Sequence, residues 1–389
     1  MAKNQKRKTW SATAHARFAR DARVATTKFL RSAPIARQWH TARLIRAYQI
    51  HLEAHRSEQA ANVLLYGVMG FEPPYHRDFN VMADRVVTNE AERIASADLY
   101  VISPEMCDVV VAAAESLTND DLQLVTADDL PTPSGCLVLP HPLVVRTCGG
   151  DLADERAFVW GIGDAVAPGL LGRHHRTAGV RITNYHDTHG PLQPQTFVEL
   201  TQAARLAGTP MPPLALSGQK FLAFEYAQPD PDSFVRLARA SQKVDGAARH
   251  AAEAAGMSED CEGQYVPGSE LDDPHDTFMA RFLYAFWRLC GQQLAEIEHL
   301  PVHHAAQVAA HRSDTSPDVR LVQLRARTQT RPREGHPVEW KHRWVVTMHK
   351  VRQWYPSENR HKILLRGPYV KGPPDKPLLS GEVVRAVVR

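Results

Sequence analysis

The stretch ADLYVISPEMCDVVVAAAESL, residues 97–117, decides the fold class. Its first half contains LYVI, an apolar run of strand length at 99–102. Ser103 then stands where a helix N-cap is expected, and Pro104-Glu105 suit the first turn of a helix. The apolar residues that follow recur at helical spacing: Met106, Val109, Val110, Ala113 and Leu117. A strand that leads directly into a capped helix predicts an α/β unit.

Toward the N-terminus the sequence predicts two helices, over residues 11–31 and from Pro34 to about Leu52. Apolar residues of the second helix recur at helical spacing. Its arginines lie mostly off that apolar stripe, so they are expected to point away from the body of the protein: Arg37, Arg43 and Arg46. Residues 1–97 therefore form the expected basic helical N-terminal region.

Toward the C-terminus, short apolar runs separated by Gly and Pro predict several strands over residues 135–227. The polar, alanine-rich segment 228–272 is interpreted as an insertion or linker. Asp273-Pro274 begins a strongly apolar helix that is expected to reach about Ile297, with Phe282 and Phe286 in the core. Three strands are predicted after this helix, at 319–327, 338–354 and 361–370, and we expect the helix to pack beneath them.

These elements indicate an α+β protein with three regions. We expect a basic helical N-terminal region (1–97), an acidic α/β middle region (98–272), and a C-terminal region (273–389) with a core helix and a basic β-sheet. The last two regions together form a mixed β-sheet body around the buried core helix.

Charge is distributed very unevenly along the chain, although the net charge is only +3. Residues 1–50 hold 12 Lys/Arg and one acid, and residues 319–389 hold 16 Lys/Arg and five acids. Each end therefore carries +11, and residues 51–318 carry −19. The basic ends are expected either to bind a polyanion or to dock on the acidic middle of the same chain or of another copy. Of these, we favour a continuous basic groove formed by both ends.

The tail segment VEWKHRWVVTMHKVRQWYPSENRHKILLRGPYVKGP, residues 338–373, mixes cations with aromatic rings. Two strand-like runs meet there at a Tyr-Pro-Ser turn, and alternation gives the first run one apolar and one basic face. A basic face suits RNA or single-stranded DNA, because cations neutralise phosphates and flat rings stack on bases. The alternative is a solvated sheet face whose cations prevent aggregation. The candidate nucleic-acid-binding residues, with those of the N-terminal helix, are Arg37, Arg43, Arg46, Arg325, Arg327, Lys341, Arg343, Lys350, Arg352, Trp354, Tyr355, Lys362, Arg366 and Lys371.

Two alternatives would make the protein an enzyme or a metalloprotein. A metal-independent nuclease or toxin needs a general base and a general acid near the phosphate; the candidates are His349, His361 and Tyr355.

A metal site would use His186, Asp187 and His189, but their H-D-x-H spacing at a strand end lets only two of them point together. We therefore expect ordinary loop histidines and no metal. The sequence contains no P-loop, no G-x-G-x-x-G and no G-x-S-x-G motif, so we expect no cofactor.

The cysteines and the apolar runs indicate where the protein resides. Five cysteines stand at positions 107, 136, 148, 261 and 290, without a C-x-x-C pair. This set argues against a disulfide framework and favours a reducing, cytoplasmic setting. The basic start lacks the apolar segment of a secretory signal. The most apolar helical run, FMARFLYAFWRLC, is too short for a membrane span and contains two arginines, so no membrane partner is expected.

Two segments resemble a known family. ADLYVISPEMCDVVVAAAESL with DLPTPSGCLVLPHPLVV, and HRWVVTMHKVRQWYPSENRHKILLRGPYVKGPPDKPL, are similar to uncharacterised proteins of actinobacteria and their phages. The resemblance covers most of 98–389. It implies an actinobacterial or mobile-element context, in which nucleic-acid handling, toxins and phage–host conflict are frequent roles. It carries over no catalytic residues.

The sequence thus predicts a protein that binds nucleic acid, RNA or single-stranded DNA, through its basic N-terminal helices and its C-terminal sheet. A metal-independent nuclease or toxin is the first alternative. The second is an adaptor whose basic ends grip acidic protein partners or a second copy of the chain.

Overall fold

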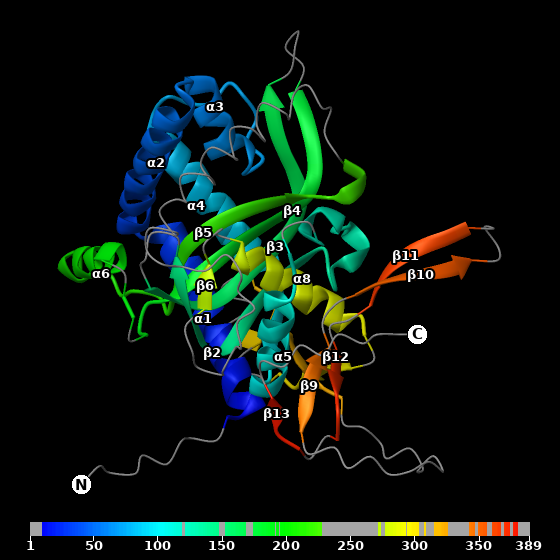
Figure 1. Ribbon diagram of the computed structural model, residues 1–389. Coiled ribbons are helices and arrows are strands. Elements are labelled where there is room, and N and C mark those ends of the chain that lie inside the picture. Colours follow the sequence, from blue (N-terminus) through cyan, green and yellow to red (C-terminus); the bar gives the residue numbers. More distant parts are fainter. Residues whose placement is uncertain are drawn as a thin grey trace, which may run out of the picture.

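The computed structural model describes residues 10–118, 121–147, 152–168, 174–190, 192–193, 195–227, 271–273, 277–292, 294–302, 307–308, 315–325, 342–346, 349–355, 360–366, 369–373 and 376–379. Figure 1 shows a central sheet with helices packed around it, and smaller groups of strands from the C-terminal part of the chain.

An eight-stranded mixed sheet forms the centre of the protein. Its strands are β1 (Asp98–Ile102), β2 (Ser134–Thr147), β3 (Leu152–Pro168), β4 (His174–Asp187), β5 (Leu214–Ala223), β6 (Leu271–Asp273), β7 (Ala295–Leu300) and β8 (Val319–Leu324). They lie in the order β5-β4-β3-β2-β1-β8-β7, and β6 pairs with β2 beside this path. β1 is parallel to β2 and β8, whereas β2–β3, β3–β4, β4–β5 and β7–β8 are antiparallel. The protein is therefore α+β, as the sequence predicts.

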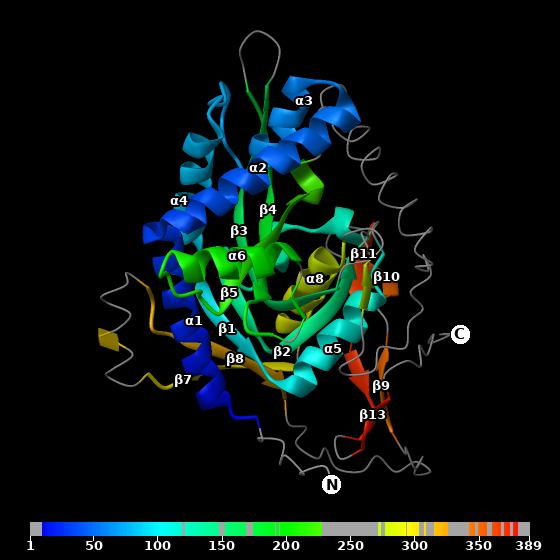
Figure 2. The same ribbon diagram turned by 90° about the vertical axis from the view of Figure 1, so that its left-hand side faces the viewer.

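Helices cover both faces of this sheet, and successive residues of β1 point to opposite faces. Tyr100 and Ile102 belong to one core with α5 (Pro104–Glu115) and α8 (Phe278–Cys290). Leu99 and Val101 belong to a second core with α1 (Ala12–Ser32) and α4 (Phe79–Ser96). Figure 2 shows α5 and α8 on one side of the central strands and α1 on the other.

The strand and capped helix predicted at 97–117 are confirmed. Ser103 caps α5, because its Oγ accepts a hydrogen bond from the backbone N–H of Met106 at 3.2 Å. Pro104 occupies the first turn, where a missing N–H costs nothing. β1 reads as a continuous apolar run, rather than an alternating one, because helices bury it from both sides.

The predicted core helix is present but is shorter than expected at both ends, because Asp273 belongs to β6 and the helix begins at Phe278. α8 ends at Cys290 and is followed by Gly291, a residue with poor helix propensity. Residues 295–300 form β7, which pairs with β8, instead of the last turns of the helix. The expected end at Ile297 is therefore wrong.

The core helix also packs in a different place from the one expected. Phe282 and Phe286 are fully buried, as predicted. Their rings contact Phe158 and Trp160 of β3, with ring centroids 5.1 Å and 6.0 Å apart. The helix thus covers the central sheet, which offers the large apolar face. The expectation that it packs beneath the predicted C-terminal strands holds only for the first of them, whose Val322 lies in the same core; the other strands pair outside the central sheet.

The predicted N-terminal helices are confirmed, and they belong to the main body. After α1 come α2 (Pro34–His55), α3 (Glu58–Asn62) and the π-helical turn η1 (Val63–Gly67). α2 packs along α4, and α1 places Ala16, Ala19 and Ala22 in the core beneath β1. A fragment that begins at residue 98 would lack this part of the core. The remaining helices are α6 (Gln195–Leu206) and the short turns η2 (Asp121–Leu124), η3 (Ala127–Asp129) and η5 (Glu225–Ala227).

The last strands of the chain form two small sheets, β10-β11 and β12-β9-β13, which we together call the C-terminal ribbon. β9 (Arg343–Val346) pairs with β12 (Tyr369–Lys371), and β10 (His349–Tyr355) pairs with β11 (Arg360–Arg366). Both pairs are antiparallel, and Val346 pairs with Tyr369 while His349 pairs with Arg366. The two pairs share one register, because three positions separate the paired residues on each strand. β10 and β11 lie on either side of the predicted Tyr-Pro-Ser turn. The short strand β13 (Leu378–Leu379) pairs with β9.

The first of the three predicted C-terminal strands lies outside this ribbon. It is β8, which pairs with β1 and β7 in the central sheet. The expected boundary between 98–272 and 273–389 consequently falls inside one shared sheet. Within the part of the chain that the structure describes, no helix is long and apolar enough to cross a membrane.

Gly135 of β2 makes room for the indole of Trp160, its partner on β3. A Cβ atom at this position would lie 2.1 Å from Cζ2 of the ring. We expect Gly135→Ala to lower the free energy of unfolding by about 1–3 kcal/mol, the usual cost of overpacking. Gly161→Ala is the matched control, because the nearest atom lies 3.8 Å from its Cβ position. Urea unfolding measures both, and equal losses in the two variants would contradict the steric explanation.

Candidate functional site

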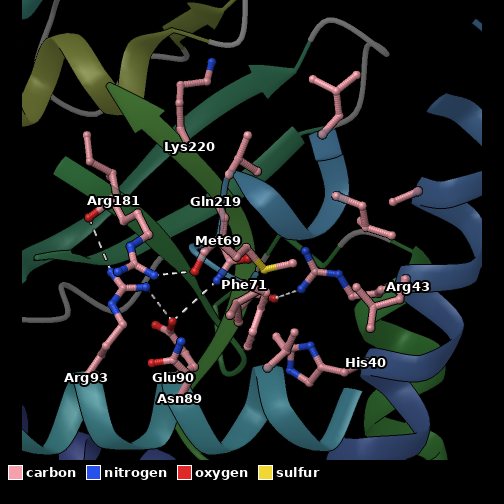
Figure 3. A pocket seen from close by; sticks show the side chains of 18 of the residues that line it. His40, Arg43, Met69, Phe71, Asn89, Glu90, Arg93, Arg181, Gln219 and Lys220 are labelled. Carbon is pink, nitrogen blue, oxygen red and sulfur yellow. Dashed lines mark hydrogen bonds and ion pairs between the residues drawn. The ribbon is translucent and has the colours of Figure 1, made fainter. Parts of the chain in front are cut away.

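A pocket of about 230 Å³ lies between α2, η1, α4 and the strands β4 and β5 (Figure 3). Four cationic side chains line it, and they come from four different elements: Arg43, Arg93, Arg181 and Lys220. One carboxylate, Glu90, shares the lining. An apolar wall comes from η1 and the residues just after it: Leu64, Leu65, Val68, Met69 and Phe71.

Arg43 reaches the pocket from α2 and is fixed by a bulge in β5. Ser217 is the extra residue where the β4–β5 register shifts. Arg43 donates from Nη1 to the carbonyl oxygen of Leu216 and from Nη2 to that of Ser217, each at 2.7 Å. Burial lowers the pKa of Arg43 to about 10, so the group stays protonated at neutral pH. The carbonyls satisfy its N–H groups but do not neutralise its charge.

Arg181 reaches the pocket from β4, and two glycines make room for its guanidinium group. A Cβ atom at Gly163 would lie 2.2 Å from Nη2, and one at Gly70 would lie 2.8 Å from Nη1. Gly70 also has a φ of +83°, which favours glycine. Nη1 of Arg181 donates to the backbone carbonyl of Met69, and Nε is buried without a hydrogen-bond partner among the described residues. Burial lowers the pKa of Arg181, and nearby Arg93 acts in the same direction.

Glu90 of α4 is the centre of a buried polar network on the floor of the pocket. Nη1 of Arg93 donates to its Oε2 at 2.8 Å, and the hydroxyl of Tyr185 donates to its Oε1. Arg93 also donates to Oγ1 of Thr183 at 3.1 Å. Gln219 donates to Oε2 of Glu90 at 3.4 Å. The one carboxylate of the lining is therefore already paired with Arg93.

His40 lies beside Arg43 in the same wall. It is buried, and this burial, with a smaller effect from Arg43, lowers its pKa to about 3. The imidazole is therefore neutral at neutral pH and adds no charge. The positive field of the pocket comes from its arginines and lysine.

The pocket therefore holds more positive than negative charge. Arg43 and Arg181 make no ion pair with any described residue, and their hydrogen bonds go to neutral carbonyls. A buried charge without a counter-ion is unfavourable, and a bound anion would relieve it. The geometry is that of an anion-binding site with an apolar side.

The predicted basic groove does not form. Arg37 forms an ion pair with Asp84 of α4, and Arg43 points into the pocket instead of onto an open surface. Arg46 is exposed on α2. Figures 1 and 2 show α2 and the C-terminal ribbon at separate places around the central sheet, so the arginines of α2 and the cations of the ribbon do not share one surface.

Other residues of the basic ends dock on the body of the same chain. Arg20 donates to the carbonyl of Pro317 at 2.7 Å, and Arg23 donates to that of Ala97 at 2.9 Å. Arg320 pairs with Asp98 at 3.0 Å. Part of the charge at both ends is thus used within the molecule, which favours the self-docking alternative for the N-terminal region.

The C-terminal candidates for nucleic-acid binding fall into three groups. Some belong to the ribbon, one follows a strand of the central sheet, and two lie outside the residues that the structure describes. Arg343 of β9 donates from Nε to the carbonyl of Lys376 at 2.8 Å, and Lys371 is exposed at the end of β12. Arg325 follows β8 and is exposed at the central sheet, so it does not extend the ribbon. Arg327 and Lys341 lie outside the described residues. The rest belong to the backbone of β10 and β11: Lys350, Arg352, Trp354, Tyr355, Lys362 and Arg366.

The register of the ribbon separates the three catalytic candidates. His361 pairs with Trp354, next to Tyr355. His349 pairs with Arg366, five register positions from the His361 pair, which is about 17 Å along a strand. The backbone register therefore places His349 apart from His361 and Tyr355.

The three metal candidates have other roles. His186 is buried, stacks on Phe197 with ring centroids 4.5 Å apart, and lies 3.1 Å from Oε1 of Gln193. Asp187 accepts a hydrogen bond from the backbone N–H of His189. These contacts hold the turn after β4. Among the residues placed by the structure, no group of three His, Cys, Asp or Glu is arranged to hold a metal ion.

Sequence reasoning missed the pocket residues other than Arg43. The available signal was Arg181, which interrupts the apolar run of β4 between Val180 and Ile182, and the nearby Gly161 and Gly163. These glycines lack phosphate-loop spacing, and the structure shows that Gly163 accommodates an arginine instead.

Comparison with known proteins found no matching family model, no similar curated protein and no similar solved structure. Inferences about function therefore start from the geometry of this chain.

Proposed function

We propose that the protein binds nucleic acid, either RNA or single-stranded DNA, through the C-terminal ribbon. One observation carries the proposal: the strands β10 and β11 extend away from the central sheet (Figure 1), and all of their Asp, Glu, Lys and Arg residues are basic. Its two strands have seven residues each and contain five Lys/Arg and no acid. A polyanion is attracted to such an extended basic element, because its cations lie apart from the net negative charge of residues 51–318.

The composition of the ribbon suits a single strand. Trp354 and His361 pair across the ribbon, and Tyr355 is next in sequence to Trp354. Aromatic side chains among cations supply stacking for bases beside charge for phosphates. The N-terminal helices, in contrast, use Arg37 and Arg43 within the molecule, so this proposal assigns the contact to the ribbon alone.

Neutralising the ribbon should weaken binding and reduce its salt dependence. The variant Arg352→Gln/Lys362→Gln removes two charges, one from each strand. We expect fluorescence anisotropy with a labelled oligoribonucleotide to show weaker binding, with a log–log salt slope smaller by about 0.7 per lost contact. Arg37→Gln is the matched control, because this exposed arginine is paired with Asp84 on another part of the surface, and its affinity and slope should be unchanged.

Oligonucleotides of RNA, single-stranded DNA and duplex DNA distinguish the possible outcomes. Retention of single strands supports the proposal, and a preference for duplex DNA would show that the ribbon enters a groove instead. Absence of retention at low salt would refute the proposal and favour the adaptor alternative. Loss of oligonucleotide integrity during incubation would revive the nuclease alternative around His361 and Tyr355.

A nucleic-acid partner and the free thiols of Cys107 and Cys136 fit a cytoplasmic protein. The resemblance to actinobacterial and phage proteins fits a role in nucleic-acid binding. Protein partners or self-association remain outcomes of the same test.

A further inference from the structure

We propose that the pocket between α2, α4, η1, β4 and β5 binds a nucleoside 5′-monophosphate or a ligand of that chemical class. The inference does not rest on nucleic-acid binding by the ribbon, because the two sites use different residues. It rests on three features of the pocket: partly buried arginines that make no ion pair with any described residue, an apolar wall beside them, and a limited volume.

The first feature indicates an anion. The positive charges of Arg43 and Arg181 are held in place by neutral backbone carbonyls. Fixing a guanidinium group through carbonyls keeps its charge available, whereas an ion pair would cancel it. Arg181 also keeps a buried Nε–H without a partner among the described residues. A phosphate oxygen is a suitable acceptor, because charge-assisted bonds from arginine to phosphate are short and strong.

The second feature indicates that the anion carries an apolar or aromatic part. Met69 and Phe71 line the pocket, and in Figure 3 they lie between the guanidinium groups of Arg43 and Arg181. A bare anion gains nothing from such a wall, whereas a flat ring stacks on it. The amide of Asn89 also lines the pocket and offers one donor group and one acceptor, as base recognition requires.

The third feature limits the size of the ligand. The volume of about 230 Å³ is below the usual range of about 300–1,000 Å³ for sites that enclose drug-sized molecules. A single nucleotide that leaves one end in solvent fits this space better than a dinucleotide cofactor. Gln219 lines the pocket and is exposed, so the pocket reaches the surface of the protein.

Isothermal titration calorimetry of the full chain tests the ligand class with three probes: adenosine 5′-monophosphate, adenosine and inorganic phosphate. We expect the monophosphate to bind at least tenfold more tightly than either fragment, because only it uses both the cations and the apolar wall. Guanosine, cytidine and uridine 5′-monophosphates extend the test to other bases. Failure of all four monophosphates to bind at millimolar concentration would overturn the proposal. Phosphate binding as tightly as the monophosphates would also overturn it, in favour of a simple anion site.

Three variants locate the binding. Arg181→Gln and Lys220→Gln should each weaken monophosphate binding at least several-fold, and Phe71→Ala should weaken monophosphate binding while leaving phosphate binding unchanged. Arg46→Gln is the matched control, since this exposed arginine of α2 does not line the pocket. If Arg181→Gln does not fold because Met69 loses its bond, Lys220→Gln still tests the site from β5. Monophosphate binding that survives both Lys220→Gln and Phe71→Ala would place it elsewhere and refute the proposal.

These variants also separate this proposal from the ribbon. The pocket variants should leave oligonucleotide binding by the ribbon unchanged. The ribbon variant Arg352→Gln/Lys362→Gln should leave monophosphate binding unchanged. Coupled losses in both assays would contradict two independent sites.

Discussion

Replacement of Phe286 by alanine should lower the free energy of unfolding by about 3–5 kcal/mol, the usual cost of emptying a buried phenylalanine site. Phe286 is fully buried in α8, the helix that covers one face of the central sheet. Its ring meets Trp160 with centroids 6.0 Å apart and an edge-on angle of 61°, and it meets Tyr100 at 6.0 Å and 82°. Removal of the ring leaves a cavity among rigid aromatic groups that cannot close around it.

Urea unfolding followed by tryptophan fluorescence measures this loss, because unfolding exposes the buried Trp160 and Trp287. Leu206→Ala is the control: its side chain is 90% exposed at the end of α6, so its loss should stay within about 0.5 kcal/mol. A loss below about 1 kcal/mol for Phe286→Ala would mean that the helix does not cover the sheet as described.

The behaviour of this helix shows what the sequence could predict. A wide apolar face at helical spacing identifies a buried helix, and Phe282 and Phe286 are buried accordingly. The element that packs on this face cannot be predicted from the sequence. Periodicity indicates that one face of the helix is buried, but it does not identify the element that buries it. The strands of the tail were the nearest candidates in sequence, whereas the helix packs on β3, more than a hundred residues earlier.

The order of the strands in the sheet likewise cannot be predicted from the sequence. Residues 319–324 read correctly as a strand, but β8 inserts between β1 and β7 in the central sheet instead of joining the ribbon. Register pairing over such distances depends on which edges remain open after the rest of the sheet has formed. The antiparallel ribbon around the Tyr-Pro-Ser turn was readable, because its pairing is local.

The pocket shows most clearly which features the sequence does not predict. Arg43 lies off the apolar stripe of α2, a position that predicts a solvent-facing side chain. In the structure the same position faces a β-bulge, whose carbonyls accept the guanidinium group. A helical stripe marks only the principal apolar contact of a helix, and it does not identify a polar contact on another side. Arg181 belongs to β4 and Glu90 to α4, which are far apart in the sequence, so no motif predicts that they lie together.

The second large effect concerns pH. His15 and His40 are both buried, 6% and 5% exposed, and burial is the main reason that their pKa values fall from 6.5 to about 4 and about 3. The folded state keeps them neutral, while the unfolded chain takes up protons as the pH falls below about 6.5. The two histidines therefore cost no stability above pH 6.5. As the pH falls from 6.5 toward their folded pKa values, the free energy of unfolding decreases.

The expected loss is on the order of 2 kcal/mol per histidine at pH 5, since one pKa unit corresponds to about 1.4 kcal/mol. His51, His141 and His186 have pKa values lowered in the same direction and add to the slope. Asp108 acts in the opposite sense, because burial raises its pKa to about 6, so acidification relieves its buried charge.

Urea unfolding at pH 7.5, 6.5, 5.5 and 5.0 should show this decline, and His15→Gln/His40→Gln should flatten it. An amide at position 15 can still donate to the carbonyl of Val138, which lies 3.1 Å from Nε2 of His15. The double variant is expected to be less stable at pH 7.5 but to lose less on acidification, because two of the proton-binding groups of the unfolded chain are gone. Asp108→Asn should steepen the decline instead, since it removes the opposing carboxyl group. A double variant that keeps the full pH slope would show that His15 and His40 are not the buried neutral groups responsible for acid sensitivity.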